Sequence, residues 1–183
     1  MAKTTFQGPV ISKAGFINTG PANVVDADSS VSLTVDTHAG RIVHNDAAGA
    51  VTYTLPATVA NSDSAVAGPG ADLNNLSNVG AKFTIVNSIT KTGSLIVQVA
   101  NATDVMTGMA TIVDTDTSDN MEGFVTASTS DTITLNGSTT GGVTHARIEC
   151  TVLASGKYAV EVFTGGTGDL ATPFSAAVSC TSI

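Results

Sequence analysis

Four side chains between residues 36 and 46 belong to the types that bind metals or transfer protons. These are Asp36, His38, His44 and Asp46. A metal or acid–base site requires such side chains to converge on one point. His38 is expected in a turn and His44 in the strand that follows it, and their spacing matches neither HExxH nor paired Cys/His ligands. We therefore expect no metal and no catalytic site here, and a partly buried His44 with a hydrogen bond.

An acidic run at residues 114 to 122, DTDTSDNME, resembles the start of a calcium-binding loop, with Asp114, Asp116 and Ser118 at alternate positions. An EF-hand requires glycine at the sixth position and glutamate at the twelfth, where this chain has Asp119 and Val125. We interpret the run as a solvated hairpin loop. A looser calcium site between strands is left open.

Other catalytic motifs are missing from the sequence. The glycine clusters at 139–142 and 164–169 lack the lysine of a phosphate-binding loop, and they are interpreted as turns. No GxSxG nucleophile elbow is present. A polysaccharide-degrading enzyme would need paired carboxylates in a cleft, and a sequence does not give separations across strands. We expect that the protein is not an enzyme and that it binds no cofactor.

The two cysteines differ in their surroundings. Cys150 lies in RIECTVLA, where Ile148, Cys150 and Val152 share one face of a strand, which predicts a small buried thiol. Cys180 is close to the end of the sequence. A disulfide between them is an open alternative, although a reducing compartment disfavours it.

Most of the chain has the two-residue periodicity of β-strands. In VTYTL, for example, Val51, Tyr53 and Leu55 point one way and Thr52 and Thr54 the other, which is typical of a half-buried strand. Strands are predicted at 31–35, 41–45, 51–56, 82–87, 94–100, 110–114, 123–128, 131–137, 146–154 and 157–164.

Gly, Asn, Asp and Ser clusters separate these runs, as expected of turns. About ten short strands without a sustained helical period indicate an all-β fold, either an antiparallel β-sandwich or a barrel of jelly-roll type. Residues 25–183 are expected to form this single domain. We predict hairpins at 41–56 and at ASGK, between the last two long strands.

Two segments fall outside the strand pattern. Residues 57–80 contain Gly68-Pro69-Gly70 and are predicted to form one long loop. Residues 1–24 contain Gly8-Pro9 and Gly20-Pro21, which favour an extended N-terminal arm.

Charge limits the classes of partner. The net charge is −8, and residues 1–22 carry Lys3 and Lys13 without an acid, so the remaining five basic residues face all fifteen acids, a total of −10. An acidic body without a basic cluster argues against binding to nucleic acid. Charged residues make up only 12% of the chain, which favours a protein that lives in an assembly. No membrane span or export signal is recognised, so we expect synthesis in a cytoplasm.

The order of several segments resembles small virion structural proteins of tailed bacteriophages, especially marine and cyanobacterial phages. The segments are TTFQGPVISKAGFI, HAGRIVHNDAAGAVTYTLP, GAKFTIVNSITKTGSLIVQV, DTITLNGSTTGG and GKYAVEVFTGGTGDLATPFS, and together they cover most of the chain. The most telling element is a strand that ends in TLP, followed by a loop and then by the segment GAKFTIVN. This pattern also recurs in phage fibre and spike modules.

The resemblance implies a capsid decoration (cement) protein on the virion surface, whose partners are the major capsid protein and, in a homotrimer, itself. The arm would lie on the capsid by main-chain pairing. Its expected apolar contacts are Phe6, Val10, Ile11, Phe16 and Ile17. The alternative is a fibre, spike or receptor-binding module of the phage head or tail.

Overall fold

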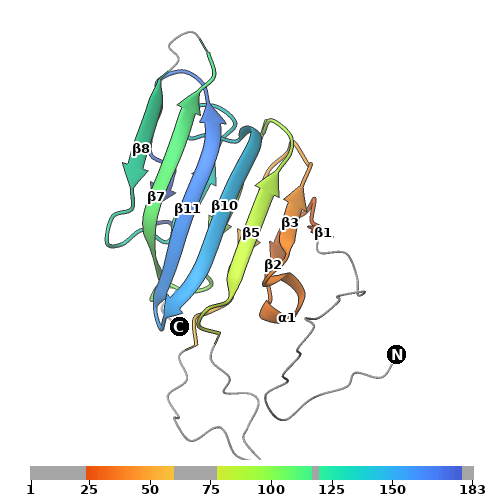
Figure 1. The fold of residues 1–183 in the computed structure, drawn as a ribbon, viewed down its shortest axis with the longest axis vertical. Coiled ribbons are helices and arrows are strands. Elements are labelled where there is room, and N and C mark those ends of the chain that lie inside the picture. Colours follow the sequence, from red (N-terminus) through yellow and green to blue (C-terminus); the bar gives the residue numbers. More distant parts are fainter. Residues whose placement is uncertain (1–23, 60–77, 117–119, 179–183) are drawn as a thin grey trace, which may run out of the picture.

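The chain folds into two β-sheets packed face to face (Figure 1). The computed structural model describes residues 24–59, 78–116 and 120–178. A seven-stranded sheet has the order β1-β3-β5-β10-β11-β7-β8, and a five-stranded sheet has the order β12-β9-β6-β4-β2. The predicted all-β class is confirmed, and of the two architectures left open, sandwich or barrel, the structure is a sandwich.

The larger sheet contains the longest strands. Its members are β1 (Val24–Asp26), β3 (Ile42–Asn45), β5 (Lys82–Asn87), β7 (Val105–Asp114), β8 (Met121–Val125), β10 (Val143–Ala154) and β11 (Lys157–Gly166). The smaller sheet contains β2 (Val31–Ser32), β4 (Val51–Thr54), β6 (Leu95–Gln98), β9 (Thr132–Leu135) and β12 (Phe174–Ser175). Each of the ten predicted strands overlaps one of these.

Three short elements were absent from the sequence prediction: β1, β12 and the one-turn helix α1 (Val35–His38). Elements of two to four residues span too few periods to be recognised. The strand predicted at 31–35 ends at Ser32, and Val35 already belongs to α1. The N–H of Thr34 donates to Nδ1 of His38 at 2.9 Å and so closes this turn.

Strand pairing is mixed, whereas the sequence prediction was antiparallel. From β1 to β6 the chain alternates between the two sheets, and each strand lies parallel to the strand two places earlier. In this part of the chain each coil contributes one strand to each sheet, and successive coils stack on one another as in a β-solenoid. Antiparallel pairs such as β10–β11 and β7–β8 follow later in the chain.

The hairpin predicted at 41–56 is wrong, because β3 and β4 belong to different sheets. Val43 on β3 and Tyr53 on β4 are both fully buried, so they contribute to the core from opposite layers. Sheets pack about 10 Å apart, a distance that the five residues between the strands easily span. The carbonyl of Ala48 in this connection accepts the N–H groups of Thr92 and Gly93, at 2.8 and 3.0 Å.

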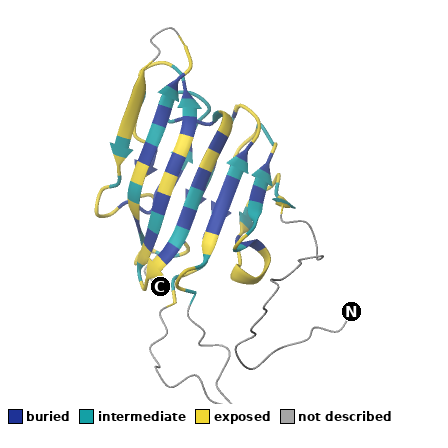
Figure 2. Ribbon diagram, viewed as in Figure 1, coloured by how far each residue is buried: buried dark blue, intermediate teal, exposed yellow. Residues whose placement is uncertain are grey.

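The hairpin predicted at ASGK is confirmed. Strands β10 and β11 pair antiparallel along most of their length, and Ala154 lies opposite Lys157. Gly156 in the turn has φ +76°, a backbone conformation that favours glycine. Along both strands buried residues alternate with more exposed ones (Figure 2).

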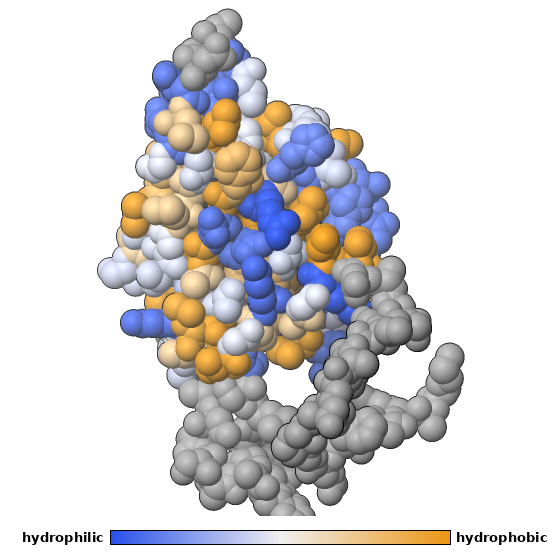
Figure 3. Space-filling model, in the orientation of Figure 1, coloured by the Kyte–Doolittle hydropathy of each residue, from blue (hydrophilic) through white to orange (hydrophobic). Residues whose placement is uncertain are grey.

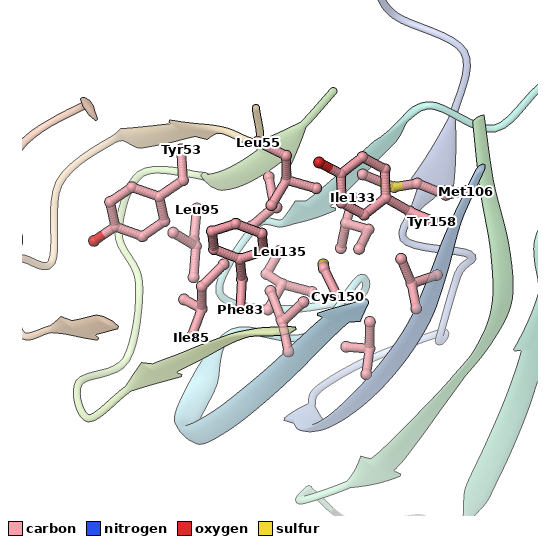
Figure 4. Packing of buried hydrophobic residues seen from close by; sticks show 14 of the residues in the cluster. Tyr53, Leu55, Phe83, Ile85, Leu95, Met106, Ile133, Leu135, Cys150 and Tyr158 are labelled. Carbon is pink, nitrogen blue, oxygen red and sulfur yellow. The ribbon is translucent and has the colours of Figure 1, made fainter. Parts of the chain in front are cut away.

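The core lies between the sheets and consists mainly of Val, Leu and Ile (Figure 4). Tyr53, Phe83 and Tyr158 are its largest side chains, and all three have no exposed surface. Each fully buried side chain of this size stabilises the fold by about 1.5–3 kcal/mol. The hydroxyl of Tyr158 donates to the carbonyl of Pro56 at 2.5 Å, so it is buried without losing its hydrogen bond.

Cys150 is a fully buried free thiol, and Ile148 and Val152 share its face, as predicted. Burial raises the pKa of this thiol to about 12. Cys180 lies outside the described residues, so the alternative of a disulfide stays a prediction.

The two ends of the predicted long loop, 57–80, are held together. The N–H of Asn78 donates to the carbonyl of Val59 at 3.1 Å, and the N–H of Val59 donates to Oδ1 of Asn78 at 2.8 Å. Residues 60–77 lie outside the described part of the chain. None of the helices in the described part has the length and hydrophobicity needed to cross a membrane.

Candidate functional site

The five residues expected to contact a capsid lie outside the described residues. Phe6, Val10, Ile11, Phe16 and Ile17 all belong to the segment 1–23. Their role therefore stays a prediction from the sequence.

The two histidines of the first candidate site have separate partners. His38 is buried in α1, where its Nδ1 accepts the N–H of Thr34. His44 lies on β3, with Nε2 2.8 Å from Oγ of Ser88 and Nδ1 3.2 Å from Oδ1 of Asp26. Val43 and Asn45 on either side of it are buried. His44 is thus a partly exposed strand residue with hydrogen bonds, as expected.

Three carboxylates gather at the β1 end of the seven-stranded sheet. Oxygen atoms of Asp26, Asp28 and Asp46 all lie within 4.8 Å of one another, and the three side chains are exposed. Of these three residues, only Asp46 belongs to the candidate site predicted from the sequence, because β1 was not predicted. The parallel register places Asp26 opposite His44, and so brings the two segments together.

Asp28 and Asp46 affect each other's ionisation. The N–H of Asp46 donates to Oδ1 of Asp28 at 3.1 Å and is the main cause that lowers the pKa of Asp28. The pKa of Asp46 is raised, first by its side-chain hydrogen bond with Asp28 and then by the charge of that carboxylate. Both groups are in water, and exposed acidic groups of this kind are common without a ligand.

The acidic run 114–122 connects an antiparallel pair, β7 and β8, in agreement with the hairpin interpretation. Oδ1 of Asp114 accepts the N–H of Asp116 at 3.1 Å, and Oδ2 of Asp116 accepts the N–H of Gly168 at 2.7 Å. These carboxylates thus cap backbone groups of neighbouring loops. Residues 117–119 lie outside the described part.

The outer face of the seven-stranded sheet carries a group of exposed apolar side chains on β7, β8 and β11. We call Met109, Met121, Val125 and Phe163 the apolar patch; their exposed fractions lie between 55% and 73%. The solvent face of a sheet is normally polar, so such a group marks a surface for interaction.

Strand register places these four residues on one face of three adjacent strands. Val125 lies opposite Met109, and Met121 lies opposite Val113. Phe163 lies opposite Thr111, which in turn lies opposite Gly123. Residues opposite each other share one face of a sheet, so the patch covers three adjacent strands. Strand β8 is exposed along most of its length (Figure 2).

Charged side chains occupy the middle of the same face, over β5 and β10. Nζ of Lys82 lies 2.5 Å from Oε2 of Glu149, and Nε of Arg147 donates to Oε1 of Glu149 at 2.9 Å. Hydrogen bonds from Lys82 and Arg147 lower the pKa of Glu149. Figure 3 shows this strongly hydrophilic group in the middle of the face and apolar side chains on the side of β7 and β8. The three charges partner one another.

Comparison with known proteins gives no relative. No family model, no curated protein and no solved structure matches the chain.

Proposed function

We propose that this chain is a virion component of a tailed bacteriophage, a decoration protein that binds the outer surface of the mature capsid. It bridges neighbouring copies of the major capsid protein and stabilises their arrangement. The resemblance described above motivates this proposal, together with the homotrimer and the virion location that it implies. No step of catalysis is involved.

The observation that carries the proposal is the apolar patch. It lies on long, regularly paired strands, so its shape is fixed before any partner arrives. A rigid surface loses little conformational entropy on binding, and exposed apolar area supplies the driving force. A fold of this kind suits a static binding protein in a large assembly.

The N-terminal arm supplies a second contact in this proposal. Its apolar residues Phe6, Val10, Ile11, Phe16 and Ile17 alternate with glycine and proline, and it carries Lys3 and Lys13 without an acid. Such a segment suits strand addition, in which main-chain hydrogen bonds provide the affinity.

Binding stabilises a capsid only if the mature lattice offers a more complete site than the immature or disassembled protein does. The gain in stability is then RT ln(1 + [L]/Kd), about 2.7 kcal/mol for each site at 100 times Kd. Because a capsid repeats the site many times, a modest affinity has a large summed effect.

The experiment is a co-sedimentation assay with purified protein and mature capsids from which the protein is missing. We expect saturable binding and a higher capsid disruption temperature. Replacing Met109 and Phe163 by serine should weaken binding at least tenfold, and deleting residues 2–20 should weaken it separately. The control is Ile89→Ser, an exposed apolar residue in the loop between β5 and β6.

Absence of binding by the unaltered protein would remove the capsid function. Unchanged binding after the serine replacements would show that the apolar patch does not contact the capsid. Unchanged binding after the deletion would show the same for the arm.

A further inference from the structure

Strand β8 has a free edge. It is the last strand of the seven-stranded sheet, and β7 is its one partner within the described residues. A free edge presents unpaired N–H and C=O groups that can pair with another chain.

The hydrogen bonds to β7 fix which residues point their backbone toward this free edge. The N–H of Asp114 donates to the carbonyl of Asn120 at 2.7 Å, and the N–H of Thr126 donates to the carbonyl of Gly108 at 3.1 Å. Hydrogen-bonded positions alternate along an antiparallel pair. Hence the backbone N–H and C=O groups of residues 120, 122, 124 and 126 point toward β7, and those of residues 121, 123 and 125 point toward the free edge.

The three residues whose backbone faces outward carry no charge and no proline, and Glu122 is the one charged residue of this strand. Met121, Gly123 and Val125 are exposed, uncharged and not proline. Natural edge strands normally carry lysine, other charges, proline or bulges at such positions. The side chains of Met121 and Val125 also belong to the apolar patch, so pairing along this edge would extend the patch.

We propose that β8 pairs with β8 of a second copy of this chain, antiparallel and about a two-fold axis at Gly123. Gly123 then lies opposite its own equivalent, and Met121 lies opposite Val125 of the other copy. The three pairs form about six inter-chain hydrogen bonds, two for each pair. The two seven-stranded sheets become one continuous sheet, and on its outer face Met121 contacts Val125 of the second copy at both ends of the contact.

The charges of β8 select this register. With the axis at Gly123, Glu122 lies opposite Phe124 of the second copy. A shift by two residues that moves the axis to Glu122 places two glutamates opposite each other, which is destabilising. A shift the other way moves the axis to Phe124 and leaves Met121 without a partner on β8. The register at Gly123 is therefore the one that uses all three outward-facing residues and juxtaposes no like charges.

The contact is small. A strand of five residues is about 17 Å long and a sheet is about 10 Å thick, so pairing buries roughly 200 Å² on each partner. Stable pairs bury about 800 Å² on each side, so free molecules should pair weakly. In a lattice that already holds neighbours close together, effective concentration strengthens such a contact. A two-fold contact is distinct from a trimer contact, because three-fold symmetry does not place β8 opposite itself.

Site-directed cross-linking tests the proposal on the full-length purified protein at submillimolar concentration. The variant is Gly123→Cys, in a background with Cys180→Ser so that buried Cys150 is the remaining native thiol. A Cβ at position 123 meets no atom within 4 Å, so the substitution fits the fold. A short bis-maleimide should join two chains quickly, because opposite Cβ atoms are about 5 Å apart.

The matched control is Glu161→Cys, exposed on β11 of the same face. In the proposed pair the two copies of position 161 are five strand spacings apart, about 24 Å. We expect cross-linking at 123 to be at least tenfold faster than at 161. Equal rates would overturn the proposal.

A second test uses charge. Replacing Met121 and Val125 by lysine should remove the concentration-dependent rise in mass seen by sedimentation equilibrium. Leu153→Lys, at an exposed apolar position near the end of β10, should leave it unchanged. A rise in mass that survives the double lysine variant, or is absent from the unaltered protein, would contradict pairing through β8. Capsid binding is measured separately, so either proposal can fail without the other.

Discussion

The two ends of the seven-stranded sheet are opposite in character. At the β1 end the strands are short and parallel, and the exposed carboxylates of Asp26, Asp28 and Asp46 surround the edge. At the β8 end, β7 and β8 are antiparallel, and the exposed residues of β8 are Met121, Glu122, Gly123 and Val125. The β1 edge is thus surrounded by several carboxylates, whereas β8 carries a single charge.

The difference extends into the interior. Behind the β1 end lies a buried polar group, in which Nδ2 of Asn45 donates to the hydroxyl of Tyr53 at 3.0 Å and Oδ1 of Asn45 accepts from Nζ of Lys91 at 3.3 Å. Burial lowers the pKa of Lys91, while the charge of Asp28 opposes this shift. The apolar end thus depends on packing, and the polar end on hydrogen bonds.

The largest effect is expected from Gly108→Ala at the apolar end. A Cβ at position 108 would lie 1.8 Å from the carbonyl oxygen of Val160, so β7 and β11 would have to separate. We expect a loss of about 4 kcal/mol in the free energy of unfolding, or failure to fold. The control is Gly123→Ala on β8, where nothing obstructs a Cβ. Urea denaturation followed by circular dichroism gives both values, and equal stability of the two variants would contradict the close approach of β7 and β11.

Asn45→Ala should have the next largest effect, at the polar end. It removes one hydrogen bond of the buried Lys91 ammonium and one of the Tyr53 hydroxyl, which keep their bonds to the carbonyls of Ala47 and Ala27, so we expect a loss of about 2 kcal/mol. Thr111→Ala on the outer face of β7 should change stability by less than about 0.5 kcal/mol. Urea denaturation of both variants is the measurement. A loss below about 1 kcal/mol for Asn45→Ala would show that the polar end does not depend on this residue.

Alkaline pH should weaken the fold through the two buried tyrosines. Burial raises the pKa of Tyr53 to about 12 and raises that of Tyr158 further. An unfolded tyrosine ionises near pH 10, so above that pH the unfolded state binds fewer protons than the folded state. The free energy of unfolding should therefore fall as pH rises from about 10 to 12.

Tyrosinate absorbance tests this directly, since the chain has two tyrosines and no tryptophan. We expect the absorbance to rise only as circular dichroism reports unfolding. In Tyr53→Phe the tyrosinate absorbance of the remaining Tyr158 should rise at a higher pH than that at which an ordinary tyrosine ionises. Ionisation with a midpoint near pH 10 in the folded protein would refute the burial of both rings.

The smallest effect concerns the carboxylates at the β1 edge. In Asp28→Asn the pKa of Asp46 should fall toward its ordinary value, because the hydrogen bond to the Asp28 carboxylate and the charge of that carboxylate, which both raise this pKa, are lost. Carboxyl chemical shifts in NMR titrations of both proteins measure this change. Stability should hardly differ, since both groups are exposed. An unchanged pKa of Asp46 would mean that the two carboxylates do not interact.

Sequence periodicity was sufficient to predict the strands but not their neighbours. Alternation identified the buried faces of β4 and β10, for example Ile148, Cys150 and Val152 on β10. The connection DAAGA suits a hairpin and a crossing between sheets equally well, because both require the same small and polar residues. Parallel pairing between β3 and β5 depends on contacts between distant segments that no local pattern encodes.

The apolar patch was predictable only in part. On β11, Phe163 is the aromatic residue on the face that otherwise carries Lys157, Ala159 and Glu161, and this irregularity was a visible signal. On β7 both faces are largely apolar, so alternation did not decide whether Met109 was buried or exposed. The cluster of Asp26, Asp28 and Asp46 could not be predicted, because it depends on β1, which spans too few residues to be recognised from the sequence.

The most direct test of the proposed role is the copy number of this chain relative to the major capsid protein, measured by quantitative mass spectrometry of purified phage particles. We expect one copy for each major capsid protein, or another simple fraction set by the lattice. A ratio lower by an order of magnitude would contradict a capsid-wide decoration protein and favour a fibre, spike or vertex module. Absence of the chain from particles would remove the virion function altogether.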